Sequence, residues 1–229
     1  MNIRILHLIE GAKQARGLTV VIDVFRAFSV EAYCFAAGAD SIIPVGDANI
    51  AYQLKADQPG RILCGERHGK ILPGFDVGNS PSDIVKMELG GKTVVHTTSA
   101  GTQGIANALH ADEILGGCLL NARATADYIR RSGASEVSLV CMGLEAIAQA
   151  DEDTLCANYI KALLEDKDLD VAAEVERLKG TTGAKFFDHT QNDVFPKTDF
   201  FMCTEVDKFD FVMRLEAGNN IQYMKKHCP

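Results

Sequence analysis

The 229-residue sequence predicts an α/β protein, a three-layer α/β/α sandwich around a largely parallel or mixed central sheet. Short runs of β-branched and apolar residues alternate along the chain with segments of helical periodicity. Several of these runs are apolar throughout, which is typical of strands that helices cover on both faces. No repeat, linker or low-complexity stretch divides the chain, so we expect one domain over residues 1–229.

The first half of the chain supplies three predicted strands, at 18–23, 41–45 and 61–64. The first strand runs into a buried helix that we expect to end at Gly38. The second precedes a helix over 47–57, for which Asp47 is the expected N-cap. A glycine-rich stretch follows the third strand, and a helix over 80–89 begins there with Pro81 in its first turn.

The second half continues the alternation, with predicted strands at 92–98, 112–117 and 136–143. Helical patterns follow these strands at 99–109, 121–133 and 152–180. The tail at 206–216 alternates only partly between apolar and polar residues. We expect it to add an edge strand that is antiparallel to its neighbour.

Composition limits the partners and the compartment. The formal net charge of −8 disfavours nucleic acid and anionic membrane surfaces, so an anionic small molecule needs local cations, backbone amides or a metal ion. No apolar run reaches the ~20 residues that span a bilayer, and the N-terminal segment lacks signal-peptide features. The seven cysteines show no CxxC spacing and lie mostly in apolar runs, which predicts core thiols in a reduced, cytoplasmic protein.

Polar residues follow several predicted strands at the point where each strand ends. Asp23 follows the first strand, Glu66 the third, and Glu152 and Asp153 come after the last central strand. In open α/β sheets, ligands bind beyond the carboxyl ends of the strands. Carboxylates gathered there repel one another, and a divalent cation relieves that repulsion; oxygen ligands without a His/Cys set favour Mg²⁺.

The turn at 97–104, TTSAGTQG, offers backbone N–H groups and hydroxyls that could hold a phosphate-like anion. Arg26, Arg67 and Lys70 could neutralise and orient such an anion. A metal ion, an anion cradle and basic side chains together favour phosphoryl chemistry.

Each feature also has a structural interpretation. Asp23 could simply cap the following helix, Glu66–Arg67 could be a surface ion pair, and 97–104 could be an ordinary turn. The macrodipole favours acids such as Glu152 and Asp153 in a first helical turn. We expect His96 to be a hydrogen-bonded core histidine. Four residues are expected on the solvated surface: Asp188, His189, Asp193 and Asp199.

Two other functions stay open. Arg67-His68-Gly69 is the triplet of the histidine phosphatases, in which His68 would be the phosphorylated nucleophile. In that family, however, the triplet lies near the first strand, whereas here it follows the third. A non-enzymatic, anion-binding regulatory protein on the same fold is the second alternative.

Taken in order along the chain, a set of motifs resembles the 2-phosphosulfolactate phosphatase (ComB-like) family. These motifs are VIDVFRAFS (21–29), AAGADSIIPV (36–45), GERHGKILPGFDVGNSP (65–81), TTSAGTQGI (97–105), GCLLNARATADYI (117–129), VCMG (140–143), EDTLCA (152–157) and the tail 193–212. The resemblance implies an α/β/α, Mg²⁺-dependent phosphatase that converts 2-phospho-3-sulfolactate to 3-sulfolactate, a step of coenzyme M biosynthesis. The sequence departs from the family pattern at Phe28, His68 and Gln103, and we expect Gln103 to leave the anion cradle one cation short.

These observations assign a role to each candidate residue. The catalytic residues are Asp23, Arg26 and Glu66; the substrate-binding residues are Arg67, Lys70, Asn79, Thr98, Ser99, Gly101 and Thr102; and the metal ligands are Asp23, Glu66, Asp76, Glu152 and Asp153. The expected partner is a small anionic phosphoester, with Mg²⁺ as cofactor. A homodimer is the general expectation for a cytosolic enzyme. An aspartyl-phosphate intermediate on Asp23 stays open.

Overall fold

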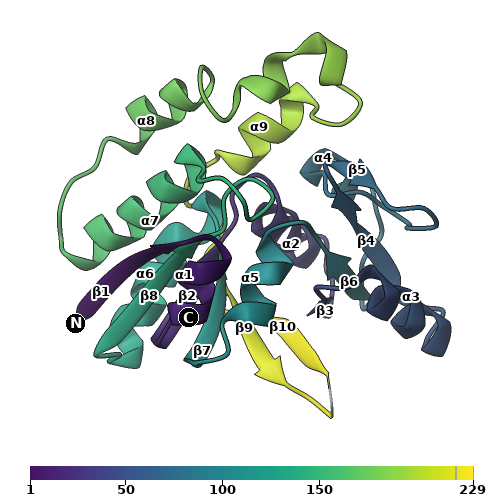
Figure 1. Ribbon diagram of the computed structural model, residues 1–229, viewed down its shortest axis with the longest axis horizontal. Helices are drawn as coiled ribbons and strands as arrows, with labels where there is room; N and C mark the ends of the chain where they lie inside the picture. Colours follow the sequence, from purple (N-terminus) through teal and green to yellow (C-terminus); the bar gives the residue numbers. More distant parts are fainter. Residues whose placement is uncertain (220, 229) are drawn as a thin grey trace.

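A ten-stranded sheet forms the centre of the protein in a computed structural model that describes residues 1–219 and 221–228 (Figure 1). The strands are β1 (Asn2–His7), β2 (Gly17–Ile22), β3 (Ser41–Pro44), β4 (Ile62–Arg67), β5 (Lys70–Ile71), β6 (Thr93–Thr97), β7 (Ala111–Gly117), β8 (Glu136–Cys141), β9 (Val212–Ala217) and β10 (Gln222–His227). Their order across the sheet is β1-β8-β2-β7-β9-β10-β3-β6-β4-β5. The predicted α/β class with a largely parallel or mixed sheet is therefore confirmed.

The helices occupy most of the connections between strands. They are α1 (Leu8–Gln14), α2 (Ala27–Ala36), α3 (Ala48–Asp57), α4 (Pro81–Ile84), α5 (Gly101–Asn107), α6 (Ala122–Ser132), α7 (Asp151–Leu164), α8 (Val171–Leu178) and α9 (Lys197–Cys203). Three short 3₁₀ helices complete the set: η1 (Leu119–Asn121), η2 (Ala184–Phe187) and η3 (His189–Gln191).

The local signals for helix ends act as predicted at two positions. The Asp47 carboxylate accepts a hydrogen bond from the Asn49 amide at 2.8 Å, which caps α3. Gly133 has a φ of 68° and ends α6 in the left-handed conformation. Other boundaries differ from the prediction, because α4 is a single turn and the helical pattern at 152–180 forms two helices, α7 and α8.

The sheet contains two parallel sets of strands. One set is β1, β8, β2 and β7, and the other is β3, β6 and β4. The hairpin β9–β10 lies between them and pairs antiparallel with β7 on one side and β3 on the other. The prediction of an antiparallel tail strand is confirmed, but its place at an edge is wrong, because the hairpin lies in the middle of the sheet.

Three antiparallel pairings in succession make the two parallel sets run in opposite directions along the sheet. The usual twist of about 20–25° per neighbouring pair accumulates from β2 to β6 and turns the second set strongly against the first. Figure 1 shows the two sets fanned apart around the hairpin. The carboxyl ends of β2 and β6 can therefore meet although the sheet is not parallel throughout.

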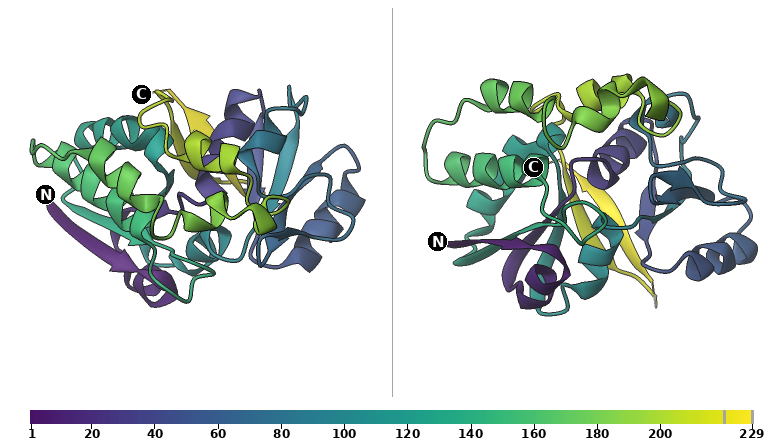
Figure 2. Two further views of the ribbon diagram at one scale, coloured as in Figure 1. Left: turned by 90° about the horizontal axis from the view of Figure 1, so that it is seen from above. Right: turned by 45° about the horizontal axis from the view of Figure 1, so that its top comes forward.

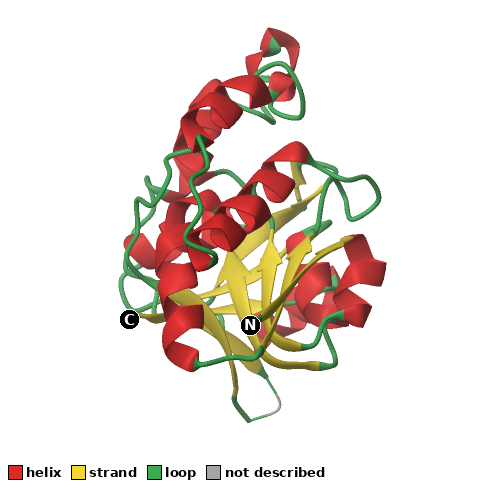
Figure 3. Ribbon diagram, turned by 90° about the vertical axis from the view of Figure 1, so that its left-hand side faces the viewer, coloured by secondary structure: helices red, strands yellow, loops and turns green. Residues whose placement is uncertain are grey.

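Helices cover both faces of the first set of strands, as the contacts of Val21 in β2 and Cys141 in β8 show. Val21 points to one face, where α5 packs against it with Gly104, and α1 packs beside α5. The opposite face carries Cys141, whose thiol donates to the Asp153 carbonyl of α7, and α6 packs beside α7. The side view in Figure 3 shows the twisted sheet between its helices.

The expected core is largely confirmed. Six of the seven thiols are buried, but the expectation of a core position is wrong for Cys228, which is exposed. Strand β1 was not predicted, yet it pairs with β8 along its whole length, from Asn2 opposite Glu136 to His7 opposite Cys141. Across residues 1–219 and 221–228, no helix has both the length and the hydrophobicity needed to cross a bilayer.

The segment 181–196, which we call the cap, rises above the strands between α8 and α9. It contains η2 and η3 and forms the light-green segment at the top of Figure 1. In the view from above, it lies in front of the sheet (Figure 2, left). Phe186 anchors the cap, because it is buried against Phe25 and Phe200, with ring centroids 4.9 and 6.1 Å away.

Candidate active site

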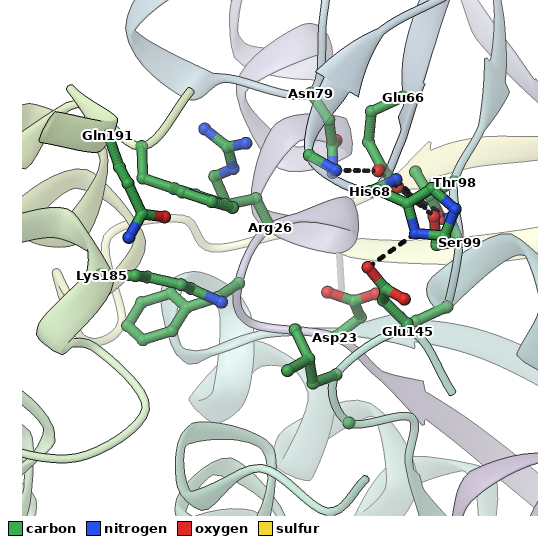
Figure 4. A pocket seen from close by; sticks show the side chains of 16 residues that line it. Asp23, Arg26, Glu66, His68, Asn79, Thr98, Ser99, Glu145, Lys185 and Gln191 are labelled. Carbon is green, nitrogen blue, oxygen red and sulfur yellow. Dashed lines mark hydrogen bonds and ion pairs between the residues drawn. The ribbon is translucent and has the colours of Figure 1, made fainter. Parts of the chain in front are cut away.

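A pocket of about 300 Å³ lies where the ends of several strands face the cap. Its walls come from the chain after β2, β4, β6 and β8, from the stretch before α4, and from the cap (Figure 4). The predicted site residues among its lining are Asp23, Arg26, Glu66, Asn79, Thr98 and Ser99. The structure thus brings six predicted residues from distant parts of the chain into one cavity.

Asp23 lies at the carboxyl end of β2, directly after the last residue of that strand. Its amide donates to the Gly117 carbonyl at 3.2 Å, and its carboxylate accepts from the Ala27 amide at 3.0 Å. Burial raises the pKa of Asp23 from 3.8 to about 6, and the nearby carboxylates of Glu66 and Glu152 add to the rise. Asp23 therefore stabilises the start of α2, as in the structural interpretation, and also presents a weakly acidic carboxyl group to the pocket.

Gly101 begins α5 against this carboxyl group. A Cβ atom at Gly101 would lie 2.6 Å from the Cβ of Ala27 and 3.0 Å from Oδ2 of Asp23. Only a residue without a side chain allows the turn to approach Asp23 this closely. The turn before α5 and the end of β2 thus form one continuous wall.

Glu66 shapes the other side of the same turn. Its Oε1 accepts from the Ser99 amide at 2.7 Å, and its Oε2 accepts from the Gly69 amide at 2.7 Å and from the Ser99 hydroxyl at 3.2 Å. The ion-pair interpretation of Glu66–Arg67 is wrong, because Arg67 donates to the Glu66 main-chain carbonyl instead. Glu66 is a buried acceptor that fixes the loop after β4 to the turn after β6.

Asp153 and Glu152 lie beneath the pocket and do not line it. The Asp153 carboxylate accepts from the Val24 amide at 2.8 Å and from the Gly143 amide at 2.7 Å, which ties the end of β2 to the end of β8. Burial raises the pKa of both acids, and each is raised further by a neighbouring carboxylate. Glu152 accepts a hydrogen bond from Thr182 at the base of the cap.

Asp76 is not part of this group. Its carboxylate accepts from the Leu63 amide at 2.7 Å and pairs with Lys55 at 3.0 Å. The predicted metal ligand Asp76 is therefore not part of the proposed site.

The carboxylates do not form a ready-made cage for a metal ion. Among the residues that the structure describes, no group of three or more His, Cys, Asp or Glu side chains is arranged to hold a metal. Mg²⁺, however, usually takes only one or two protein carboxylates and keeps water and substrate oxygens as its other ligands. Asp23 fits that mode, because it is buried at the pocket and its pKa is raised by burial and by the neighbouring carboxylates of Glu66 and Glu152, a repulsion that a cation would relieve.

The basic side chains that were predicted to bind the anion occupy different positions. The Arg26 guanidinium lines the pocket, but it is buried and pairs with Asp199 at 2.7 Å. Asp199 also accepts from the Ser80 hydroxyl and the Ser82 amide, so its expected surface position is wrong.

Three further predicted substrate-binding residues lie outside the pocket wall. Arg67 donates to the Gly46 carbonyl and the Thr97 hydroxyl, and Lys70 lines a neighbouring hollow. The hydroxyl of Thr102 accepts from the Thr98 amide at 2.9 Å and thereby holds the preceding turn to the start of α5. Gln103 also turns away, because its amide donates to the Gly46 carbonyl at 2.7 Å.

Asn79 reaches the pocket from a buried polar network. His96 lies 2.9 Å from Glu31 through Nδ1 and 3.2 Å from the Asn79 side-chain oxygen through Nε2. Burial alone lowers the pKa of His96, but the neighbouring Cys64 and Glu31 raise it to about 10. The protonated ring donates from both nitrogens, so the Asn79 oxygen is occupied and its NH₂ group is left for the pocket. The expectation of a hydrogen-bonded core histidine is confirmed.

His68 lies at the rim, with a side chain that is 79% exposed. Its Nδ1 is 2.9 Å from the Glu145 carboxylate, so the loops after β4 and β8 meet over the pocket (Figure 4). An exposed, paired histidine gives little support to the phosphohistidine alternative, which requires the nucleophile to face bound phosphate.

Sequence reasoning missed the pocket residues that come from the cap and from the loop after β8. Those whose side chains bear on the site include Glu145, Lys185, Gln191 and Phe195. One signal was available, since aromatic residues recur at 186, 187 and 195 within an otherwise polar segment. Such a pattern indicates a segment that packs onto the protein rather than a solvated loop.

Comparisons with known proteins agree with the motifs. The family described as 2-phosphosulpholactate phosphatase matches residues 3–218. A Bacillus subtilis (strain 168) protein named probable 2-phosphosulfolactate phosphatase is 33% identical over 211 residues, which is 91% of this chain and 91% of the relative. A protein of the same name from Caldanaerobacter subterraneus is 34% identical over 213 residues, covering 87% of this chain and 88% of the relative.

Proposed function

Because this chain belongs to the 2-phosphosulfolactate phosphatase family, we propose that it releases phosphate from 2-phospho-3-sulfolactate or a related small phosphorylated hydroxy acid. The observation that carries the proposal is Asp23, a buried carboxyl group with a pKa of about 6 against the turn before α5. Perturbed carboxyl groups of this kind mark acid–base sites. The place of the reaction in coenzyme M biosynthesis stays a prediction.

The turn at 98–100 and Asn79 are the proposed contacts for the phosphoryl group. Thr98, Ser99 and Ala100 line the pocket beside Asp23, and the Asn79 NH₂ group faces the same cavity. Donors fixed in advance by the surrounding structure can stabilise the charge that develops during phosphoryl transfer. His96 and Glu31 would act as positioning residues, because they hold the Asn79 oxygen and keep its donor group toward the substrate.

Asp23 is the proposed general base. Its Oδ1 is held by the Ala27 amide, whereas Oδ2 lies toward Gly101 and the pocket. In its ionised form, Oδ2 can accept a proton from an attacking water molecule as the new P–O bond forms and the ester P–O bond breaks, and it can then return that proton to the departing alkoxide oxygen. A direct attack of Oδ2 on phosphorus would instead expel the hydroxy acid and give an acyl phosphate, and reductive trapping of that intermediate with borohydride separates the two routes.

We also propose that Asp23 contributes to holding Mg²⁺, with Glu66 near enough to do so through water. Glu66 is less suited to direct coordination of the ion, because both of its oxygens already accept hydrogen bonds. When bound, the ion would supply positive charge beside the phosphoryl oxygens in a pocket whose Arg26 is already paired.

The test is phosphate release from a panel of small phosphorylated hydroxy acids, measured with Mg²⁺ and with excess chelator. Activity on 2-phospho-3-sulfolactate that requires Mg²⁺ is the expected result. Saturable binding of the same compounds without phosphate release would favour the regulatory alternative. Activity that survives chelation, with a trapped phosphohistidine at His68, would favour the histidine mechanism.

A further inference from the structure

Lys185 is a cation in the pocket wall, where two other basic side chains are already paired. Arg26 is paired with Asp199 at 2.7 Å, and His68 is paired with Glu145 at 2.9 Å. Within residues 1–219 and 221–228, the Lys185 ammonium group forms neither a hydrogen bond nor a salt bridge, although it lines the pocket. Its charge is therefore available to a ligand.

Aromatic rings hold Lys185 in place. Its Nζ lies 5.1 Å from the ring centroid of Phe195, 5.6 Å from that of Phe186 and 5.9 Å from that of Phe25. These rings pack on one another, with centroids 4.9 Å apart for Phe25–Phe186 and 5.7 Å apart for Phe186–Phe195. The ring faces attract the ammonium group and exclude water on that side, without satisfying its hydrogen-bond donors.

The Lys185 charge acts on Glu152, whose pKa it lowers against the larger effect of burial. The Glu152 carboxylate, however, takes its hydrogen bond from Thr182 rather than from Lys185. Lys185 thus interacts electrostatically with an acid below the pocket, but among the described residues it has no hydrogen-bonded partner in the pocket itself.

Lys185 lies across the pocket from the proposed reaction centre. Figure 4 shows Lys185 and Gln191 on the cap side, whereas Glu66 and Ser99 are on the opposite wall. A ligand whose phosphate is near Ser99 and Asp23 would therefore extend its other end toward an ammonium group and an amide. Two separate polar ends suit a phosphoester that carries a second acidic group.

We infer that Lys185 binds an acidic group of the substrate that is not esterified, a carboxylate or a sulfonate, and that Gln191 donates to the same group. This inference rests on the proposed function and adds to it the residue that selects doubly acidic substrates. A lysine suits the task because its compact charge pairs with single oxygens of either group. The positive charge of Lys185 favours binding of an anionic substrate to a chain whose net charge is −8.

The test compares wild type with Lys185→Gln on three esters. These are 2-phospho-3-sulfolactate, 2-phospholactate, which lacks the sulfonate, and phosphorylated isethionate, which lacks the carboxylate. Loss of a charge-assisted hydrogen bond should lower kcat/KM for the first ester by about 10- to 100-fold, mainly through KM. The loss should disappear for the ester that lacks the group bound by Lys185, which identifies that group.

Two variants serve as controls. Lys185→Arg keeps the charge and should retain most of the wild-type kcat/KM. Lys197→Gln removes a similar lysine that lies over Phe187 and Phe201 outside the pocket, and it should leave kcat/KM unchanged.

Equal losses on all three esters, or no loss on any, would overturn the inference while leaving the phosphatase proposal in place. If wild type releases phosphate from none of them, the proposed function fails and a binding measurement decides the inference. Titration calorimetry with 3-sulfolactate should then show weaker binding to Lys185→Gln than to wild type. Equal binding, or none to wild type, would overturn the inference.

Discussion

Replacing Asp23 with Asn should stabilise the protein while abolishing turnover. The side chain is buried, and its pKa rises from 3.8 in the unfolded chain to about 6 in the fold. A shift of this size corresponds to roughly 3 kcal/mol of unfavourable free energy when the carboxyl group is ionised. Because the folded state holds its proton more tightly, the wild type loses this stability as pH rises from about 4 to about 6.

Asp23→Asn removes that loss, because asparagine stays neutral and its side-chain oxygen can still accept from the Ala27 amide. Its NH₂ group near the Gly101 amide offsets part of the gain, since two donors then face each other. We expect the variant to be more stable than wild type at pH 8 by about 1–3 kcal/mol. The difference should nearly vanish at pH 4.

The assay is urea unfolding at pH 4, 6 and 8 in the presence of a chelator, followed by the same series with Mg²⁺. Added Mg²⁺ should stabilise wild type and leave Asp23→Asn unchanged, which tests the proposed ion without relying on activity. A variant that matches wild type at every pH would show that the Asp23 carboxyl group is not desolvated. Unchanged phosphate release in the variant would remove Asp23 from the reaction.

Three further outcomes follow from the same geometry. At a limiting Mg²⁺ concentration, wild-type kcat/KM should rise between pH 5 and 7 as Asp23 of the metal-free protein ionises with a pKa of about 6, and a rate that falls over this range would contradict its role as the base. Gly101→Ala should lower kcat/KM at least about tenfold, because the new Cβ lies 3.0 Å from the Asp23 carboxylate, whereas Gly60→Ala in open space should match wild type. His96→Leu should lower the free energy of unfolding by about 3–5 kcal/mol, and the added change Glu31→Leu should recover most of it; an additive loss would argue against the buried pair.

The sequence predicted the strand ends of the site well, because burial and chain direction are local properties. A carboxylate at the carboxyl end of a buried strand, directly after β2 for Asp23 and within the last residues of β4 for Glu66, lies where the strand leaves the sheet. Both residues line the pocket for that reason. Asp76 follows no strand end, and a pairing with Lys55 that spans 21 positions decides its place.

Long-range packing decided what the sequence left open. Nothing local to Asp199 indicates that Arg26, 173 positions earlier, neutralises it in the interior. The cap likewise packs through the contact of Phe25 with Phe186, and Lys185 of the cap lies over the Phe25 ring. The single domain, the homodimer, the cytoplasmic location and the absence of a nucleic-acid partner stay predictions.

The hairpin β9–β10 joins two groups of strands that all precede it in the chain. Until residues 212–227 have been synthesised, β7 and β3 each have an unpaired edge, and such edges invite pairing with other chains. A nascent chain that stops at residue 211 would therefore hold two half-sheets with no shared backbone hydrogen bonds. The candidate active-site pocket, which draws on both halves, can therefore form only near the end of translation.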